Sequence, residues 1–478
     1  MYKSHLVSFL VLGLFVILPL RAQDNPKHLP LSSFVEYGAT VHHGDNTPLW
    51  QVGNQYGLSS LKNNTYLRAG TFYADSIGKW QLHGGLDMAV AAGFTSTFVL
   101  QQAYADIRYW KIALFGGTKE IGSPLLNRTL SSGDLTYSDN ARPVPQIMLY
   151  MPDYMRLGRL FAFKVEFSYG WFTDGDFLKE RVQANATYVR GVKYHHKSLL
   201  MRIGAPQSKW RLDLGIVTNV QFGGYEKFGD QSVDLGNTFK DYLRVLIPQA
   251  GGEDTKSFEQ EFYQGNTVGS EYVMGTYRHK DFMLRAYLQN HFDDMSAMGK
   301  QNGFDGLWGL EYRSVKRQVL SGVVLEYFQT TNQSGPLHGI EDVGVGKTGG
   351  GDNYYNHWLY GTSSHWGMLL GNPLIPSPIY NKNHRNTLYY NRVQAVHVGV
   401  SGDISCDWSY TAKLSYNKTF GTHYAPLIKP IENFSTFVAV LYAPHRLEGW
   451  TFHVSAALDT GEIYGDNVGF QLKIKKTF

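Results

Sequence analysis

Cysteine is almost absent from this chain of 478 residues, which contains Cys406 alone. One cysteine cannot form an internal disulfide, so the fold is held without covalent cross-links. Long apolar runs are also scarce. Residues 6–20 form one, but no other stretch approaches the roughly 20 apolar residues that a membrane-spanning helix needs. The sequence therefore excludes a protein built from several membrane-spanning helices.

Catalytic and metal-binding motifs are missing as well. The chain has no G-x-S-x-G nucleophile elbow, no H-E-x-x-H and no paired cysteines. The adjacent histidines at 42–43 and 195–196 would point to opposite faces of a strand, which makes them poor joint ligands. Glu341 stands where a phosphate-binding loop at 344–352 would need its first glycine. We therefore expect no enzymatic activity, no catalytic residue, no metal ion and no cofactor.

An excess of charge of one sign is lacking too. The 44 lysines and arginines nearly balance the 40 aspartates and glutamates, and the formal net charge is +4. Such a balance gives no indication of nucleic acid as a partner.

The N-terminus has the pattern of an export signal. Lys3 precedes the apolar run at 6–20, and Ala22 is a small residue at its end. This pattern predicts a signal peptide over residues 1–22, removed before Gln23, and one mature domain over 23–478. An N-terminal membrane anchor is the alternative, although the run is short for a spanning helix.

What the sequence has in abundance is apolar–polar alternation with a period of two. In the last stretch Val468, Phe470 and Leu472 alternate with polar residues, and Phe478 ends the chain. A strand of this kind offers one face to hydrocarbon and the other to water. A terminal Phe on such a strand resembles the C-terminal signature of bacterial outer-membrane proteins. Further stretches with strong alternation cover 80–90, 161–171, 210–220, 408–417 and 450–458.

These strands predict an all-β fold, a transmembrane antiparallel β-barrel of about 18 strands. Aromatic residues near the strand ends would form its belts at the two membrane interfaces. A soluble β-sandwich is the alternative. Three segments break the alternation, namely 119–159, 222–268 and 329–393. Helical spacing from Phe239 to Leu246 predicts a short amphipathic helix in the second, packed on or inside the barrel, with a partner-binding helix as the alternative. We expect long loops and this short helix to occlude the barrel.

Several stretches resemble the Wzi family of capsule assembly proteins. They include N-T-P-L-W-Q-V-G-N-Q-Y-G-L-S-S at 46–60, S-S-G-D-L-T-Y-S-D-N-A-R-P-V-P-Q-I at 131–147 and Y-H-H-K-S-L-L-M-R-I-G at 194–204. The resemblance implies an 18-stranded barrel with an occluded lumen in the outer membrane of a Gram-negative cell. It implies a lectin-like protein that binds and helps attach or assemble capsular polysaccharide. Implied partners are that polysaccharide, outer-membrane lipid and the barrel assembly machinery. An outer-membrane porin or saccharide transporter is the alternative function.

The loop predicted to bind sugar follows from counting strands. Barrel chains begin and end on the periplasmic side, so counting backward from Phe478 places 329–393 at the cell surface. Aromatic rings suit the apolar faces of sugars, and cations suit acidic sugar units. The carbohydrate-binding candidates in this segment are Tyr354, Tyr355, Trp358, Trp366, Lys382 and Arg385. The alternative is that these aromatics only pack the loop over the barrel mouth.

Overall fold

The computed structural model describes residues 30–123, 125–181, 186–246, 265–293, 295–333 and 352–478. The predicted signal peptide at 1–22 and nearly all of the glycine-rich stretch at 344–352 lie outside these ranges. In the part of the chain that is described, no helix combines the length and the apolar character needed to cross a membrane.

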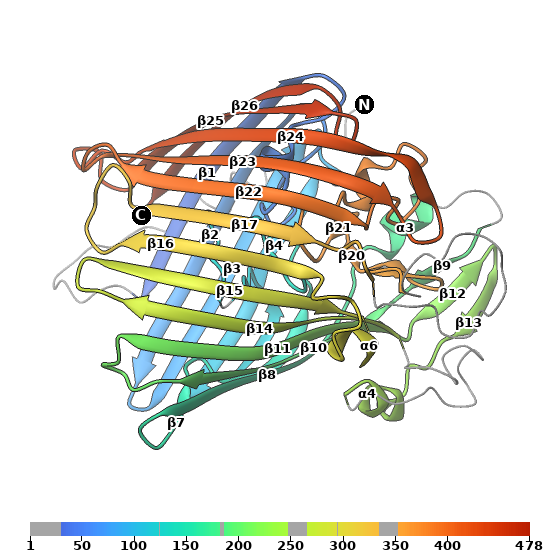
Figure 1. Cartoon of the computed structure of the whole chain (residues 1–478), viewed down its shortest axis with the longest axis horizontal. Helices are drawn as coiled ribbons and strands as arrows, with labels where there is room; N and C mark the ends of the chain where they lie inside the picture. Colours follow the sequence, from blue (N-terminus) through green and yellow to red (C-terminus); the bar gives the residue numbers. More distant parts are fainter. Residues whose placement is uncertain (1–29, 124, 182–185, 247–264, 294, 334–351) are drawn as a thin grey trace, which may run out of the picture.

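The chain forms a closed antiparallel barrel of 18 strands (Figure 1). Closure joins the two ends of the chain, because β26 pairs with β1 from Phe34 opposite Thr477 to His43 opposite Val468. The segments β6 and β7 both pair with β8 and together make one interrupted strand. The wall consists of β1 (Leu31–His43), β2 (Asn64–Ile77), β3 (Trp80–Ala92), β4 (Phe98–Tyr109), β5 (Ile112–Thr118), β6 (Gln146–Tyr150) with β7 (Met155–Leu157), β8 (Phe161–Trp171), β10 (Lys193–Ile203), β11 (Trp210–Phe222), β14 (Asn266–Arg278), β15 (Phe282–Phe292), β16 (Gly306–Ser314), β17 (Gly322–Gln329), β22 (Val393–Asp403), β23 (Trp408–Gly421), β24 (Pro426–Tyr442), β25 (Trp450–Gly461) and β26 (Asn467–Thr477).

Two parts of the wall differ from the alternation pattern. Residues 146–157, inside a segment predicted to be irregular, supply β6 and β7, and the break at 151–154 hides their alternation. The stretch 187–203 could be read from its sequence as one long strand or two short ones, and it forms two, β9 (Tyr188–Arg190) and β10. β9 leaves the wall and forms a small sheet with β12 (Tyr225–Phe228) and β13 (Gln231–Asp234).

Apolar side chains cover the outside of the barrel. The outward residues of the terminal strand, such as Phe470, are exposed, whereas Gln471 on the other face is buried. Aromatic pairs band the outer face near one rim, with ring centroids 4.6 Å apart for Trp80–Tyr109, 4.7 Å for Trp210–Tyr277 and 4.3 Å for Trp408–Tyr442. An apolar outer face bounded by aromatic residues is the surface that a lipid bilayer stabilises. The fold is therefore a transmembrane β-barrel, as predicted.

The two rims of the barrel carry different connections. The terminal rim holds Leu31, Thr477 and short turns such as 78–79, 110–111 and 404–407. The loop rim holds the long connections, including 119–145, 223–265 and 330–392. Bacterial barrels have short periplasmic turns and long extracellular loops, so we assign the loop rim to the cell surface. The predicted placement of 329–393 on the rim opposite the termini is confirmed for its described residues, 329–333 and 352–393.

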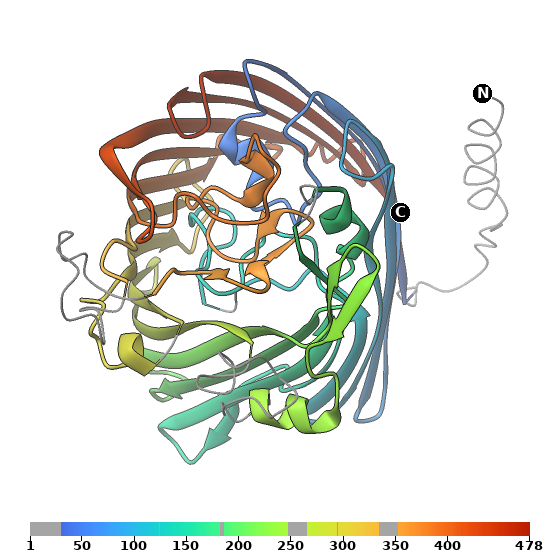
Figure 2. The same cartoon turned by 90° about the vertical axis from the view of Figure 1, so that its right-hand side faces the viewer.

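The lumen is filled by the chain's own loops (Figure 2). Residues 44–63, 119–145 and 352–392 fold inward and, with the wall, build a core cluster that includes Trp50, Leu135 and Leu369. We call these three segments the plug. The short helix α2 (Leu49–Val52) lies wholly buried in it. Lumen charges pair with one another, as Lys164–Glu166 and Arg211–Asp213 do at 2.9 Å each.

The other helices lie near the loop rim. They are α3 (Gly175–Arg181), α4 (Phe239–Leu246) and α6 (Met295–Met298), with a single 3-10 turn η1 (Pro378–Tyr380) in the plug. α4 is the helix predicted from helical spacing, but it packs outside the wall. Its Tyr242 ring lies 5.2 Å from outward-facing Tyr169, and outward-facing Lys197 donates hydrogen bonds to the carbonyls of Val245 and Leu246 at 3.2 and 2.8 Å. Occlusion of the lumen by the helix at 239–246 is thus wrong. The apolar face of α4 covers apolar wall residues there, and α2 occupies the lumen instead.

Candidate functional site at the loop rim

Two tight hairpins bring tryptophans to the loop rim. In one, β18 (Asn356–His357) pairs with β19 (Gly361–Thr362), and Trp358 lies in the turn between them. In the other, β20 (Ser364–His365) pairs with β21 (Met368–Leu369), and Trp366 and Gly367 form the turn. Trp366 has a φ of 55°, a left-handed conformation that a bulky residue adopts only when its surroundings hold it there.

Four groups hold Trp366 in this conformation. Its main-chain N–H donates to Asp174 Oδ2 at 2.9 Å, and its indole N–H donates to Thr173 Oγ1 at 3.3 Å. Phe177 lies 5.7 Å from the ring, and the Arg142 guanidinium carbon lies 4.5 Å from the ring centroid. A cation over an indole face is an attractive arrangement, and it is stronger when water is excluded. Trp366 is therefore fixed in place by its neighbours and is not the tip of a free loop.

Arg142 is the charged centre of this site. The side chain is 8 % exposed and donates to Ser96 Oγ and Thr95 Oγ1 at 2.9 Å each. Burial lowers the pKa of Arg142 to about 10, which still leaves it charged at neutral pH. Burial also raises the pKa of nearby Asp174. Sequence reasoning missed Arg142 as a site residue, although it lies within the N-A-R-P run at 140–143.

The structure separates the six predicted binding residues into two groups. Trp358 is 54 % exposed, and Lys382 and Arg385 are exposed at the loop rim. The Lys382 ammonium lies 3.7 Å from a carboxylate oxygen of Asp45. These three residues and the half-buried Trp366 are the predicted binding residues that reach the surface of the loop rim.

Tyr354 and Tyr355 correct the sequence prediction, because both are completely buried. The Tyr355 hydroxyl donates to the carbonyl of Leu135 at 2.7 Å, and Asn302 donates to the Tyr354 hydroxyl at 3.1 Å. Both rings also lie against His291, at 4.2 and 4.7 Å. They fasten the plug to the wall and cannot contact an external sugar. These two residues therefore fit the alternative interpretation, in which the aromatics only pack the loop over the barrel mouth.

Neutral histidines support both hairpins. The Thr173 N–H donates to His365 Nε2 at 3.2 Å, so the Nδ1–H of His365 donates to the Arg142 carbonyl at 3.0 Å. The Leu359 N–H donates to His357 Nδ1 at 3.2 Å. Burial lowers the pKa of His365 and lowers that of His357 to about 4.

Acidification is therefore expected to loosen the first hairpin. Its opened form takes up a proton on His357 as the pH falls below 6.5, whereas the closed form stays neutral until about pH 4. The free energy of opening should fall across this window by up to about 3 kcal/mol. Amide hydrogen exchange of residues 356–362, corrected for intrinsic rates, should show less protection at pH 4.5 than at pH 7. His357→Gln should remove this pH dependence, and an equal dependence in that variant would contradict the assignment.

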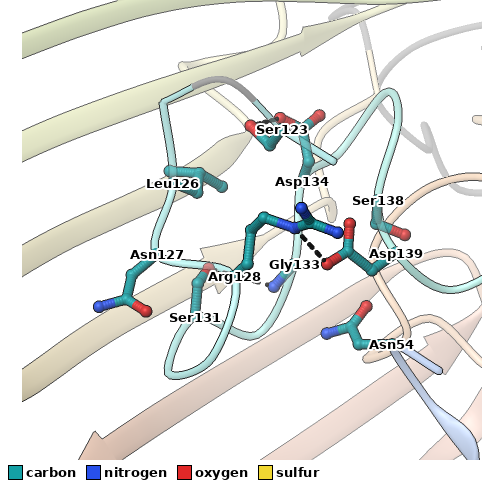
Figure 3. A pocket seen from close by; sticks show the side chains of 10 residues that line it. All are labelled: Asn54, Ser123, Leu126, Asn127, Arg128, Ser131, Gly133, Asp134, Ser138 and Asp139. Carbon is teal, nitrogen blue, oxygen red and sulfur yellow. Dashed lines mark hydrogen bonds and ion pairs between the residues drawn. The ribbon is translucent and has the colours of Figure 1, made fainter. Parts of the chain in front are cut away.

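The cavity in Figure 3 is too small to hold a sugar. It lies in the plug between Asn54 and the 123–139 loop, and it is crossed by the 2.9 Å Arg128–Asp139 ion pair. Its volume is about 20 Å³, which is room for roughly one water molecule. Any sugar ligand would therefore have to bind elsewhere on the molecule.

One group of possible metal ligands was not expected from the sequence. Cys406, Asp407 and His445 meet at the terminal rim, where their ligand atoms lie within 4.8 Å of one another. Cys406 and His445 are exposed, and His445 Nδ1 lies 3.1 Å from both carboxylate oxygens of Asp407. The two turns that carry them are distant in sequence, which is why no spacing motif marks the group.

Comparison with known proteins identifies the fold. No protein-family model matches the chain, and no curated protein matches it. Among solved structures, Wzi of Escherichia coli matches with a TM-score of 0.55 and 13% sequence identity, covering 92% of this chain and 83% of Wzi. This chain has the fold of Wzi. Wzi is described as an outer-membrane protein involved in group 1 capsule assembly and as a carbohydrate-binding β-barrel. The predicted resemblance to Wzi is thus confirmed at the level of the fold.

Two other outer-membrane barrels match less well than Wzi. OccD3 of Pseudomonas aeruginosa has a TM-score of 0.48 and 10% identity, covering 95% of this chain and 91% of OccD3. OccAB2 of Acinetobacter baumannii has a TM-score of 0.47 and 9% identity, covering 94% of this chain and 98% of OccAB2. The Wzi-type barrel, with its apolar outer face, is an outer-membrane fold of Gram-negative cells.

Proposed function

We propose that this chain is a non-enzymatic outer-membrane protein that binds capsular polysaccharide at the cell surface and helps attach or assemble it. The observation that carries the proposal is the division of the 352–392 segment. Part of the segment closes the lumen, and the rest holds two tryptophan-tipped hairpins and two exposed cations at the loop rim. A barrel with a closed lumen, and with aromatic and cationic side chains on its outer rim, suits attachment of a polysaccharide better than passage of a solute through the lumen.

The chemistry of the rim supports a sugar ligand. Indole faces pack against the C–H faces of pyranose rings, and lysine and arginine pair with carboxylates of acidic sugars. Trp358 and Trp366 supply the faces, and Lys382 and Arg385 supply the charges. The likeness to Wzi, described as a carbohydrate-binding barrel, supports the same ligand class.

The proposal also covers export and biogenesis. The sequence pattern at 1–22 supports removal of a signal peptide, and the amphipathic last strand ending in Phe478 supports delivery through the barrel assembly machinery. Outer-membrane lipid would then surround the apolar outer face.

Replacing Trp358 or Trp366 by Ala, separately, should weaken polysaccharide binding about fivefold or more in each variant, because each change removes a stacking face. The measurement is capture of the cell's own capsular polysaccharide by the purified barrel, alongside capsule retention by cells. Trp366→Phe should restore part of the binding, since it keeps a ring over Arg142.

Trp110→Ala is the matched control, because Trp110 is 68 % exposed but lies in the β4–β5 turn on the opposite rim. It should bind like the parent protein. All variants should show the heat-modifiable migration of a folded barrel. Parent-like binding by folded Trp358→Ala and Trp366→Ala would reject this rim as the sugar site.

A further inference from the structure

Arginines line the lumen near the terminal rim. Five of them are either the next-to-last residue of a strand that ends at this rim or the second residue of a strand that starts there. Two more lie close by. All have the parity of the buried, lumen-facing residues of their strands. They are Arg108 on β4, Arg156 on β7, Arg202 on β10, Arg211 on β11, Arg278 on β14, Arg285 on β15 and Arg313 on β16. They span one continuous side of the barrel, which we call the arginine mouth.

Three carboxylates in the arginine mouth are each shared by two cations. The groups are Asp106 with Arg108 at 2.9 Å and Lys119 at 3.2 Å, Asp213 with Arg202 at 2.6 Å and Arg211 at 2.9 Å, and Glu311 with Arg285 at 3.2 Å and Arg313 at 2.9 Å. Each group therefore keeps one positive charge in excess.

The cations of these groups are more exposed than the carboxylates that they share. The side chains of Asp106, Asp213 and Glu311 are at most 1 % exposed, whereas that of Arg313 is 47 % exposed. Arg156 adds to the charge, because its guanidinium donates to the main-chain carbonyls of Arg159 and Gly204 at 2.9 Å each. An anion from outside the chain would neutralise the excess charge of these groups.

Tyrosines lie among these charges. The Arg202 guanidinium carbon lies 3.7 Å from the centroid of the Tyr154 ring, and the Tyr150 hydroxyl donates to Asp106 at 2.7 Å. Rings beside guanidinium groups suit a ligand that carries both apolar C–H faces and carboxylates. Acidic sugars have this combination.

We propose that the arginine mouth is a second binding site, open to the periplasm, that takes an acidic oligosaccharide bearing carboxylates. The arginine mouth lies on the lumen side of the wall, so a narrow oligosaccharide chain can enter it more easily than a folded protein. A folded protein would first meet the exposed lysines of the turns. The site is separate from the loop rim, and binding at it does not depend on Trp358 or Trp366.

The test removes the excess charge while keeping every carboxylate paired. In Arg108→Gln/Arg202→Gln/Arg313→Gln, Asp106 keeps Lys119, Asp213 keeps Arg211 and Glu311 keeps Arg285. The probe is oligogalacturonate, titrated into the full-length barrel in detergent by calorimetry, with a neutral maltooligosaccharide alongside. We expect the parent protein to bind oligogalacturonate but not the maltooligosaccharide, and added salt should weaken this binding. The triple variant should bind oligogalacturonate about tenfold more weakly than the parent.

The matched control is Lys79→Gln/Lys209→Gln/Lys280→Gln, which removes three exposed charges from turns of the same rim. It should bind oligogalacturonate like the parent. The proposal is overturned if the triple arginine variant, shown to be folded by heat-modifiable migration, binds like the parent. Equal losses in the control, or equally tight binding of a hexa-aspartate peptide by the parent, would also overturn it. Trp358→Ala should bind this probe like the parent, which separates failure here from failure at the loop rim.

Discussion

Replacing residues 331–391 by a short Gly-Ser turn is expected to turn a closed barrel into a conducting one, with a rise of at least about tenfold in single-channel conductance. Gln329 and Gln394 are paired neighbours on β17 and β22, so a short turn joins these strands without disturbing the wall. The removed segment includes Tyr354, Tyr355 and Leu369 of the lumen core. Once they are gone, water fills the space that these side chains occupy. Planar-bilayer recording of the parent and the deletion variant is the measurement.

A matched deletion controls for general damage. Replacing the β12–β13 hairpin, which lies in the small sheet outside the wall, by an equally short turn should leave the conductance low. A steady large current from the parent protein would contradict the closed lumen and favour the porin alternative. Unchanged conductance after removal of 331–391 would show that the remaining plug segments suffice for closure.

Glu326→Ala is expected to release the 119–145 part of the plug while leaving the wall intact. Glu326 is 1 % exposed and accepts hydrogen bonds from Ser131 Oγ at 2.6 Å, Ser132 N at 2.7 Å and Tyr287 Oη at 2.6 Å. The alanine variant leaves three buried donors without an acceptor, at a cost of about 3 kcal/mol or more. Most of this cost falls on the docking of the plug, because Ser131 and Ser132 belong to it. Trypsin cleavage at Arg128 should become at least about tenfold faster.

Glu432→Ala is the control for this experiment. Glu432 lies near the loop rim with a half-exposed side chain 3.3 Å from Lys418. Exposed pairs of this kind contribute at most about 1 kcal/mol, so cleavage at Arg128 should keep the parent rate. Heat-modifiable migration should be retained in both variants. If Glu326→Ala resists trypsin like the parent, the plug does not depend on this carboxylate.

Most strands of the barrel wall could be predicted from the sequence. Alternation marked β8, β11, β25 and β26 because each strand faces lipid on one side and the lumen on the other, so a local pattern carries the information. Strand counting then placed the 329–393 loop on the rim opposite the termini, since each antiparallel strand reverses the direction of the chain. β6 and β7 escaped because the irregular residues between them interrupt the period.

Only the tertiary structure decided which loop residues reach solvent. Tyr354, Tyr355 and Trp358 have the same aromatic character in the sequence, yet two are buried and one is exposed. The difference depends on distant partners such as Leu135 and His291, which no local pattern reveals. The helix α4 shows the same limit. Its spacing specifies an apolar face, but whether that face meets the lumen or the outer wall depends on how the strands beside it are arranged.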